Sequence, residues 1–151
     1  MGQFLGTHVN RLDRKGRVSV PAPFRAVLAR CETAEVILRP HHKSACIEAW
    51  PEPEFRQLAA RLDRLDSFSD DRDALAFALF ASAHSATPDA EGRIVLPEPL
   101  IAHASLAEMV AFVGLGRVFQ IWAPEAAERM TRESVRTARE RGLTLPAGGL
   151  A

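Results

Sequence analysis

The sequence predicts an α+β fold in which two copies of one strand-rich unit share a core and are flanked by helices. The stretch Asp13 to Phe24 returns as Asp89 to Leu100, with five of its positions identical. In both copies a run rich in Val and Ile follows the turn residues, which is typical of β structure. Each copy spans only about 50 residues, a size at which a separate hydrophobic core is marginal, so we expect a shared core.

The repeated stretch begins with a tight turn. Asp13 can accept hydrogen bonds from the backbone amides ahead of it, and Gly16 can take a positive φ at little cost. Asp89 and Gly92 hold the same positions in the second copy. We therefore expect each copy to form a strand, a hairpin turn with a glycine bulge and a returning strand that pairs with the first.

Prolines end the repeated stretch. Pro21 and Pro97 lack an amide donor and should end the strand, whereas Pro23 and Pro99 suit the first turn of a short helix. Turn residues and apolar periodicity predict the remaining elements: a strand over 4–12, a helix over 24–30, hairpins over 35–50 and 109–122, and helices over 52–65, 74–83 and 125–141.

These elements divide the chain into a first unit over 4–53, a helical linker over 54–79, a second unit over 80–126, and a C-terminal helix with a loose tail over 127–151. Phe80 and His84 match Phe4 and His8 at the offset that relates Asp89 to Asp13, which extends the repeat upstream of the turn.

Histidines and cysteines offer a possible metal site. His8 and His84 recur, and His41 and His42 lie near Cys46, but neither group has the spacing of zinc ligands. We interpret the first pair as ordinary strand residues and the second as a polar turn, and we expect no metal and no cofactor.

Charge is unevenly distributed along a chain whose formal net charge is zero. Residues 1–50 hold eight Lys or Arg and four Asp or Glu, residues 51–128 hold six and thirteen, and residues 129–151 hold five and two. The basic excess therefore lies with the first copy and the C-terminal helix, and such a local excess can attract a polyanion. Four arginines line one face of that helix (Arg129, Arg132, Arg136 and Arg139), where contact with water, an acidic helix or nucleic acid are all open.

Catalytic motifs are missing from the sequence. It has no phosphate-binding glycine loop, no nucleophile elbow and no tyrosine, and Ser19 is replaced by Val95 in the second copy. No apolar stretch approaches the ~20 residues of a membrane-spanning helix, and the first residues do not resemble a signal peptide. We expect a cytoplasmic protein with no enzymatic activity, no small-molecule substrate and no membrane partner.

The recurring charged pairs, Asp13 with Arg17 and Asp89 with Arg93, permit two interpretations. Each pair can be a surface ion pair worth about 0–1 kcal/mol that only supports its turn. Alternatively, the carboxylate can hold a guanidinium outward to bind phosphate or the edge of guanine. The residues alone leave both interpretations open.

The doubled motif decides between them through a resemblance. Asp-x-x-Gly-Arg-Val-x-Val-Pro at 13–21, with its second copy at 89–97, resembles the AbrB-type swapped-hairpin DNA-binding unit. Two such units joined by helices within about 150 residues resemble the MraZ family of transcriptional regulators. This resemblance implies an AbrB-like β-barrel formed by two interlocked units within one chain, with flanking helices.

The resemblance also implies a function. The family forms ring-shaped homo-oligomers that bind direct repeats in double-stranded promoter DNA and usually repress the division and cell-wall gene cluster, so we expect a nucleoid-associated repressor. The implied alternative is an antitoxin-like or scaffold module that binds a protein partner. DNA-binding residues carried over to this sequence are Arg17, positioned by Asp13, with Arg11, Arg14 and Lys15 nearby, and Arg93 with Asp89, on turns formed by Gly16 and Gly92. The second tip is Ala90-Glu91 rather than Arg14-Lys15, so we expect the first turn to dominate.

Overall fold

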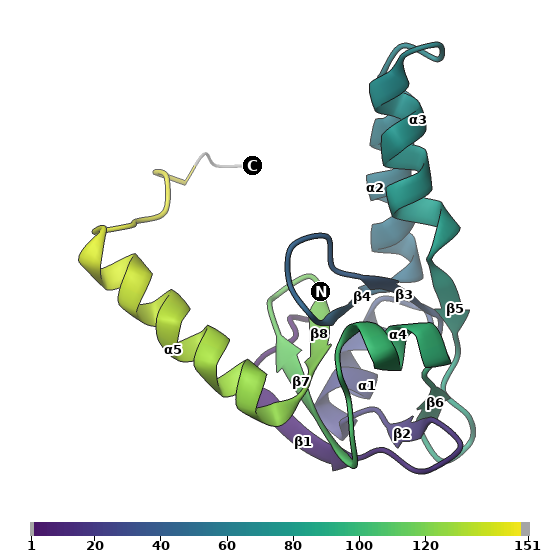
Figure 1. Cartoon of the computed structure of the whole chain (residues 1–151), viewed down its shortest axis with the longest axis vertical. Helices are drawn as coiled ribbons and strands as arrows, with labels where there is room; N and C mark the ends of the chain where they lie inside the picture. Colours follow the sequence, from purple (N-terminus) through teal and green to yellow (C-terminus); the bar gives the residue numbers. More distant parts are fainter. Residues whose placement is uncertain (1, 149–151) are drawn as a thin grey trace.

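The computed structural model describes residues 2–148, in which pairs of consecutive strands are separated by helices (Figure 1). In chain order the elements are β1 (Thr7–Arg11), β2 (Arg17–Ser19), α1 (Ala22–Arg30), β3 (Val36–Pro40), β4 (Ile47–Pro51), α2 (Glu52–Leu62), α3 (Asp70–Ala76), a π-helix η1 (Phe77–Ala81), β5 (His84–Ala86), β6 (Arg93–Val95), α4 (Glu98–His103), β7 (Met109–Gly114), β8 (Phe119–Trp122) and α5 (Pro124–Glu140). The prediction of an α+β fold is confirmed.

Strands from both halves of the chain are interleaved in one antiparallel sheet of order β1-β7-β8-β4-β3-β5. Strand β1 of the first half pairs with β7 of the second, and β5 of the second half pairs with β3 of the first. His8 lies opposite Phe112 and His84 lies opposite Leu38, so the two histidines occupy equivalent strand positions. Each half thus completes the sheet of the other.

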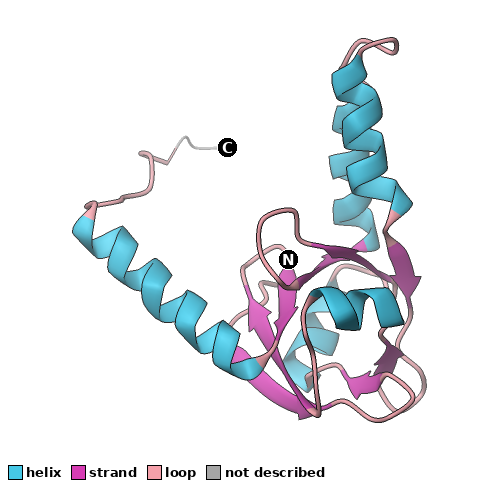
Figure 2. Ribbon diagram, viewed as in Figure 1, coloured by secondary structure: helices cyan, strands magenta, loops and turns pink. Residues whose placement is uncertain are grey.

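The returning strand of each copy pairs differently from our expectation. We predicted that β2 would pair with β1 in a local hairpin, but β2 pairs with β6 in a separate two-stranded ribbon. Beyond the end of β1, the amide of Leu12 still donates to the carbonyl of Glu108 (2.8 Å), while the turn that follows diverts the chain toward β6. Figure 2 shows this short ribbon apart from the larger sheet.

The two copies are related by an approximate twofold axis. In the ribbon, Val18 lies opposite Ile94, which is its own counterpart in the repeat. In the main sheet, Glu48 lies opposite Gln120, its counterpart once the shorter loop of the second hairpin is allowed for. Two self-pairing positions in different sheets are what a twofold relation between the copies produces.

Apolar side chains from both halves form the core. Phe24 of α1 packs its ring against Phe4 (5.2 Å between centroids), Phe119 (5.1 Å) and Phe112 (6.4 Å). All four rings are almost inaccessible to solvent. The expectation of one shared core is therefore confirmed.

The helices that join the halves stand away from the sheets as a hairpin (Figure 2). The first ends at Leu62 rather than 65, and the second begins at Asp70, because the Ser69 hydroxyl accepts a hydrogen bond from the amide of Arg72 (3.1 Å). Phe80 lies in the π-helix with 44% of its surface exposed, whereas Phe4 is 1% exposed. The repeat therefore does not extend to Phe80.

Helix α5 also projects from the body of the molecule (Figure 1), and Ala127 is its one buried residue among those described. This helix ends at Glu140, one residue before the predicted end, and is followed by Gly142 with φ of +59°. No helix within residues 2–148 has the length and apolar character that crossing a membrane requires.

Candidate nucleic-acid interface

The first turn fixes Arg17 through the carboxylate of Asp13. One carboxylate oxygen, Oδ1, accepts hydrogen bonds from the backbone amides of Lys15 (2.9 Å) and Arg17 (2.8 Å). The other, Oδ2, accepts a hydrogen bond from Nε of the Arg17 guanidinium at 2.8 Å. Gly16 has φ of +81°, which lets the chain make this tight reversal. Backbone and side chain are thus ordered by one carboxylate.

The second turn repeats this arrangement. Oδ1 of Asp89 accepts hydrogen bonds from the backbone amides of Glu91 (2.9 Å) and Arg93 (3.0 Å). Oδ2 accepts a hydrogen bond from Nε of Arg93 (3.2 Å), and Gly92 has φ of +81°. Equal geometry at two sites far apart in the sequence indicates that the motif itself, rather than its surroundings, specifies the turn.

Both aspartates are more acidic than usual. The pKa of Asp13 is lowered from 3.8, first by the hydrogen bond from the backbone amide of Arg17 and further by its side chain. The pKa of Asp89 is lowered in the same way, first by the backbone amide of Arg93. Each carboxylate is therefore ionised at neutral pH and held close to its arginine.

The β2–β6 ribbon places both arginines on one face. Val18 and Ile94 point into the core with 1% exposure each, so their neighbours on the same strands point outward. The outward residues include Arg17 and Arg93, whose side chains are 37% and 32% exposed. They are diagonal neighbours across the ribbon, because Arg17 lies opposite Val95, two residues beyond Arg93. Such neighbours are about 7–8 Å apart.

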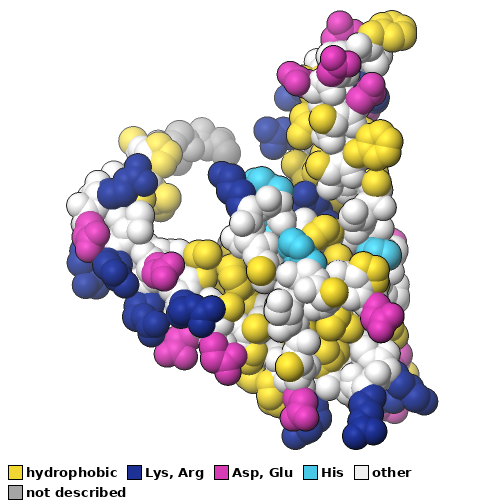
Figure 3. Space-filling model, viewed as in Figure 1, with side chains coloured by type: hydrophobic (Ala, Val, Ile, Leu, Met, Phe, Trp, Pro, Cys, Tyr) yellow, Lys and Arg dark blue, Asp and Glu magenta, His cyan; other side chains and the backbone are white. Residues whose placement is uncertain are grey.

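The charges around the two arginines differ. At the first turn Arg14 and Lys15 are exposed at the tip, and Arg11 is exposed at the end of β1. Lys and Arg side chains stand out at the lower right of Figure 3, where Figure 1 places β2, β6 and the turns before them. At the second turn Nη2 of Arg93 is 3.3 Å from the carboxylate of Glu91. Its guanidinium is thus partly neutralised, whereas no described residue pairs with the terminal nitrogens of Arg17.

One cation near the second turn was not anticipated from the sequence. The side chain of Arg25, on α1, crosses the backbone of Gly92 so closely that a Cβ atom there would lie 2.5 Å from Nη1. Its counterpart in the repeat, Ile101, lies beside Gly16. The repeat aligns Arg25 with Ile101, but only the strand pairing between halves brings each to the opposite copy's turn.

The other polar groups singled out from the sequence lie elsewhere. His41 accepts hydrogen bonds at Nδ1 from the amides of Lys43 and Ser44 (both 3.1 Å), which makes it part of a polar turn. Within residues 2–148, no three His, Cys, Asp or Glu side chains gather in a way that could hold a metal ion.

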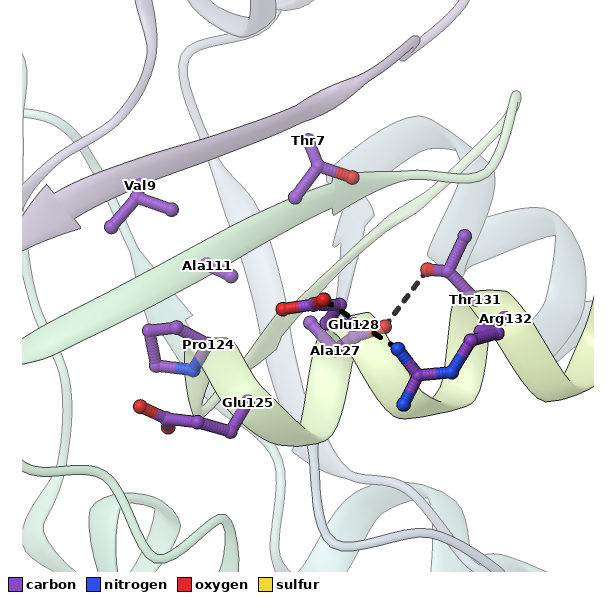
Figure 4. A pocket seen from close by; sticks show the side chains of 9 residues that line it. All are labelled: Thr7, Val9, Ala111, Pro124, Glu125, Ala127, Glu128, Thr131 and Arg132. Atoms are coloured by element: carbon purple, nitrogen blue, oxygen red, sulfur yellow. Dashed lines mark hydrogen bonds and ion pairs between the residues drawn. The ribbon is translucent and has the colours of Figure 1, made fainter.

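The arginine stripe lies on the projecting helix α5. Figure 4 shows a groove between α5 and the strands β1 and β7, with Thr7 and Val9 on one side and Glu128 and Arg132 on the other. Arg132 is 3.5 Å from Glu128 of the same helix. That arginine therefore already has an acidic neighbour one turn away.

Comparison with known proteins places the chain in a family. The family model described as "MraZ protein, putative antitoxin-like" matches twice, over residues 3–78 and 79–145. Among similar proteins is the transcriptional regulator MraZ of Gluconacetobacter diazotrophicus, 57% identical over 99% of this chain and 95% of that protein. The proteins of the same name from Gluconobacter oxydans (52% identical, 96% of this chain, 88% of that protein) and Rickettsia canadensis (39%, 96% and 97%) are also similar. With the doubled turn, the interlocked halves and these matches, the chain belongs to the MraZ family.

Proposed function

We propose that this protein is a transcriptional regulator that binds specific DNA sequences through its two turns and has no enzymatic activity. The relatives are named transcriptional regulators, which supports the regulatory role. The observation that carries the DNA-binding role is the pair of outward arginines, each held by an aspartate on a rigid turn. Asp13, Arg17, Asp89 and Arg93 are the proposed recognition residues.

The geometry suits recognition of phosphate or guanine. Asp13 engages Arg17 at Nε, so the two terminal nitrogens remain to donate parallel hydrogen bonds. Because the side chain is already ordered, less conformational entropy is lost when DNA binds. Arg11, Arg14 and Lys15 add contacts to the phosphate backbone, which makes binding depend strongly on salt. The first turn is the stronger reader, and Arg93 has an auxiliary role in DNA binding or contacts a neighbouring subunit.

The proposal extends to assembly. Interlocking halves support an AbrB-like swapped-hairpin barrel as the folding unit. Copies of this unit form a ring and bind direct repeats in a promoter, where the high effective concentration of linked sites compensates for weak single contacts. Exposed apolar side chains on the projecting parts of the molecule are candidate subunit contacts, such as Phe68 (95% exposed) in the turn between α2 and α3 and Val135 (53%) on α5. The regulated promoter is that of the division and cell-wall genes, and binding represses it at the nucleoid.

A second function is favoured by one observation, because the matching family model is described as putative antitoxin-like. In that case the turns would bind a protein partner, and loss of a turn arginine would leave DNA binding unaffected.

Substitution of Arg17 separates the two functions. Arg17→Ala removes a bidentate contact worth about 1–3 kcal/mol, so affinity for the duplex upstream of the protein's own coding sequence should fall about 5- to 150-fold per site. Arg56→Ala is the matched control, because Arg56 is 72% exposed on α2 and pairs with Glu52. Gel-shift titration measures the affinity, and light scattering checks that the oligomer survives. Equal affinities of the two variants would contradict the DNA-binding proposal.

A further inference from the structure

We propose that Arg25 of the first copy supplies the second turn with the phosphate-binding cation that its own tip lacks. This inference rests on the proposed DNA-binding function. It means that the second turn binds phosphate more strongly than its own tip residues would allow. It adds a recognition residue outside the repeated Asp-x-x-x-Arg motif.

The position of Arg25 carries the first step. Its Nη1, Cζ and Cδ atoms lie 2.5, 2.8 and 2.9 Å from the point where a Cβ of Gly92 would be. The guanidinium therefore lies directly against the turn, and the missing side chain of Gly92 makes room for it. Arg25 is exposed to solvent, so an anion that approaches the second turn can reach it.

The charge of Arg25 is available. Within residues 2–148, no carboxylate lies within ion-pair distance of Arg25, and the nearby Glu91 instead pairs with Arg93 at 3.3 Å. The segment from Asp89 to Arg93 contains two acidic residues and one basic residue, a net charge of −1. Arg25 brings this turn to neutrality and gives it a second guanidinium, which reduces its repulsion of a phosphate.

The repeat provides an internal comparison. At the first turn, Ile101 takes the place that Arg25 takes at the second, and its Cδ1 lies 3.7 Å from where a Cβ of Gly16 would be. That turn carries Lys15 where the second carries Glu91. Of the two equivalent helices, α1 thus contributes a cation to the turn with the acidic tip, whereas α4 contributes an apolar side chain to the turn with the basic tip. A cation needed solely for folding would have no reason to follow this inverse pattern.

The test uses the full-length protein and the duplex immediately upstream of its own coding sequence, titrated at several salt concentrations. Arg25→Ala should weaken binding about three- to tenfold, and the slope of log K against log[salt] should become shallower by about one for each Arg25 engaged. Arg30→Ala is the matched control, since Arg30 lies on the last turn of the same helix, against Gly2. It should leave both quantities unchanged.

A rescue variant tests the assigned role directly. Glu91→Lys places at the second tip the residue type found at Lys15, so it should restore affinity and salt slope in the Arg25→Ala background. Unchanged melting temperatures show that folding is intact, which a surface position predicts. The inference is overturned if Arg25→Ala behaves like Arg30→Ala, or if Glu91→Lys fails to restore binding.

The outcomes distinguish failure of the proposed role of Arg25 from failure of the proposed DNA-binding function. If Arg17→Ala abolishes binding while Arg25→Ala does not, the DNA-binding function stands and the role of Arg25 is wrong. If the wild-type protein binds this duplex no better than a duplex of scrambled sequence, both proposals fail.

Discussion

Glu48→Gln should strongly destabilise the protein, although glutamine is what the second copy carries at this place. Glu48 Oε1 accepts a hydrogen bond from Nη1 of Arg39 at 2.5 Å and from the indole of Trp50 at 2.9 Å. Arg39 is only 6% exposed, and its Nε has no hydrogen-bond partner within residues 2–148. A glutamine keeps an acceptor for the indole, as Gln120 does for Trp122 (2.8 Å), but leaves the guanidinium without a counter-charge.

The magnitude follows from the buried arginine. Removal of one member of a buried ion pair typically costs about 3–5 kcal/mol, because the other charge stays desolvated. Glu48 keeps 12% side-chain exposure, so we expect the lower end, about 3 kcal/mol. A domain of this size has a total stability of about 5–15 kcal/mol, so the loss is a large part of it. With a urea m value of about 2 kcal/mol/M, the unfolding midpoint should fall by about 1.5 M.

Urea denaturation followed by tryptophan fluorescence measures this shift, and the second copy supplies the control. Phe112 lies opposite His8 and Leu38 lies opposite His84, so Val113 and Arg39, the residues that follow them, are counterparts in the two copies. The double variant Glu48→Gln with Arg39→Val therefore gives the first half the two residues that the second half carries at these positions. This variant buries no charge and should recover most of the lost stability. The reasoning is refuted if the single variant unfolds within about 0.5 M urea of the wild type, or if the double variant is no more stable than the single.

Three further predictions concern the turns and the core. Gly16→Ala should destabilise the protein more than Gly92→Ala does. Both substitutions force a side chain into φ of +81°, at a cost of about 1–2 kcal/mol. The new Cβ meets a backbone carbonyl 2.9 Å away at position 16 but a flexible arginine side chain at position 92. Thermal melting ranks them. Burial raises the pKa of the Cys46 thiol to about 12, so the stability that the protonated thiol contributes is full below pH 9 and is lost at higher pH. In the native protein at pH 8, Cys46 should not react with a thiol reagent. The lowered pKa values of Asp13 and Asp89 mean that their stabilisation is full above about pH 4 and is lost on further acidification, so carboxyl NMR titrations should have midpoints below 3.8.

Local patterns predicted the elements of this fold well. The prolines mark the starts of α1 and α4. The Asp and Gly spacing predicts a tight turn in each copy, and both turns form, with matching backbone hydrogen bonds of 2.8 and 3.0 Å to the two aspartates. These features depend on residues a few positions apart, whose hydrogen bonds and allowed φ values the sequence specifies directly.

Local patterns did not predict which strands pair between the two halves, although the resemblance implied interlocked units. We expected β2 to return along β1, since adjacent strands commonly pair, but Val18 instead lies opposite Ile94. The approach of Arg25 to Gly92 depends on that pairing, so no spacing within one copy could have indicated it. The roles of Arg17 and the other turn residues in DNA binding stay predictions.

Fusion of the two copies into one chain gives the ribbon a polarity. If two identical chains paired at Val18 to form this ribbon, both ends of the ribbon would carry the same turn residues. Such a symmetric ribbon could not distinguish the two orientations of a DNA segment. Here Lys15 stands on one side and Glu91 on the other, because each half can change independently of its partner. Under the proposed DNA-binding function, a ribbon with two different tips would favour one orientation on the duplex. Binding sites that repeat head to tail, rather than as palindromes, require such a preference.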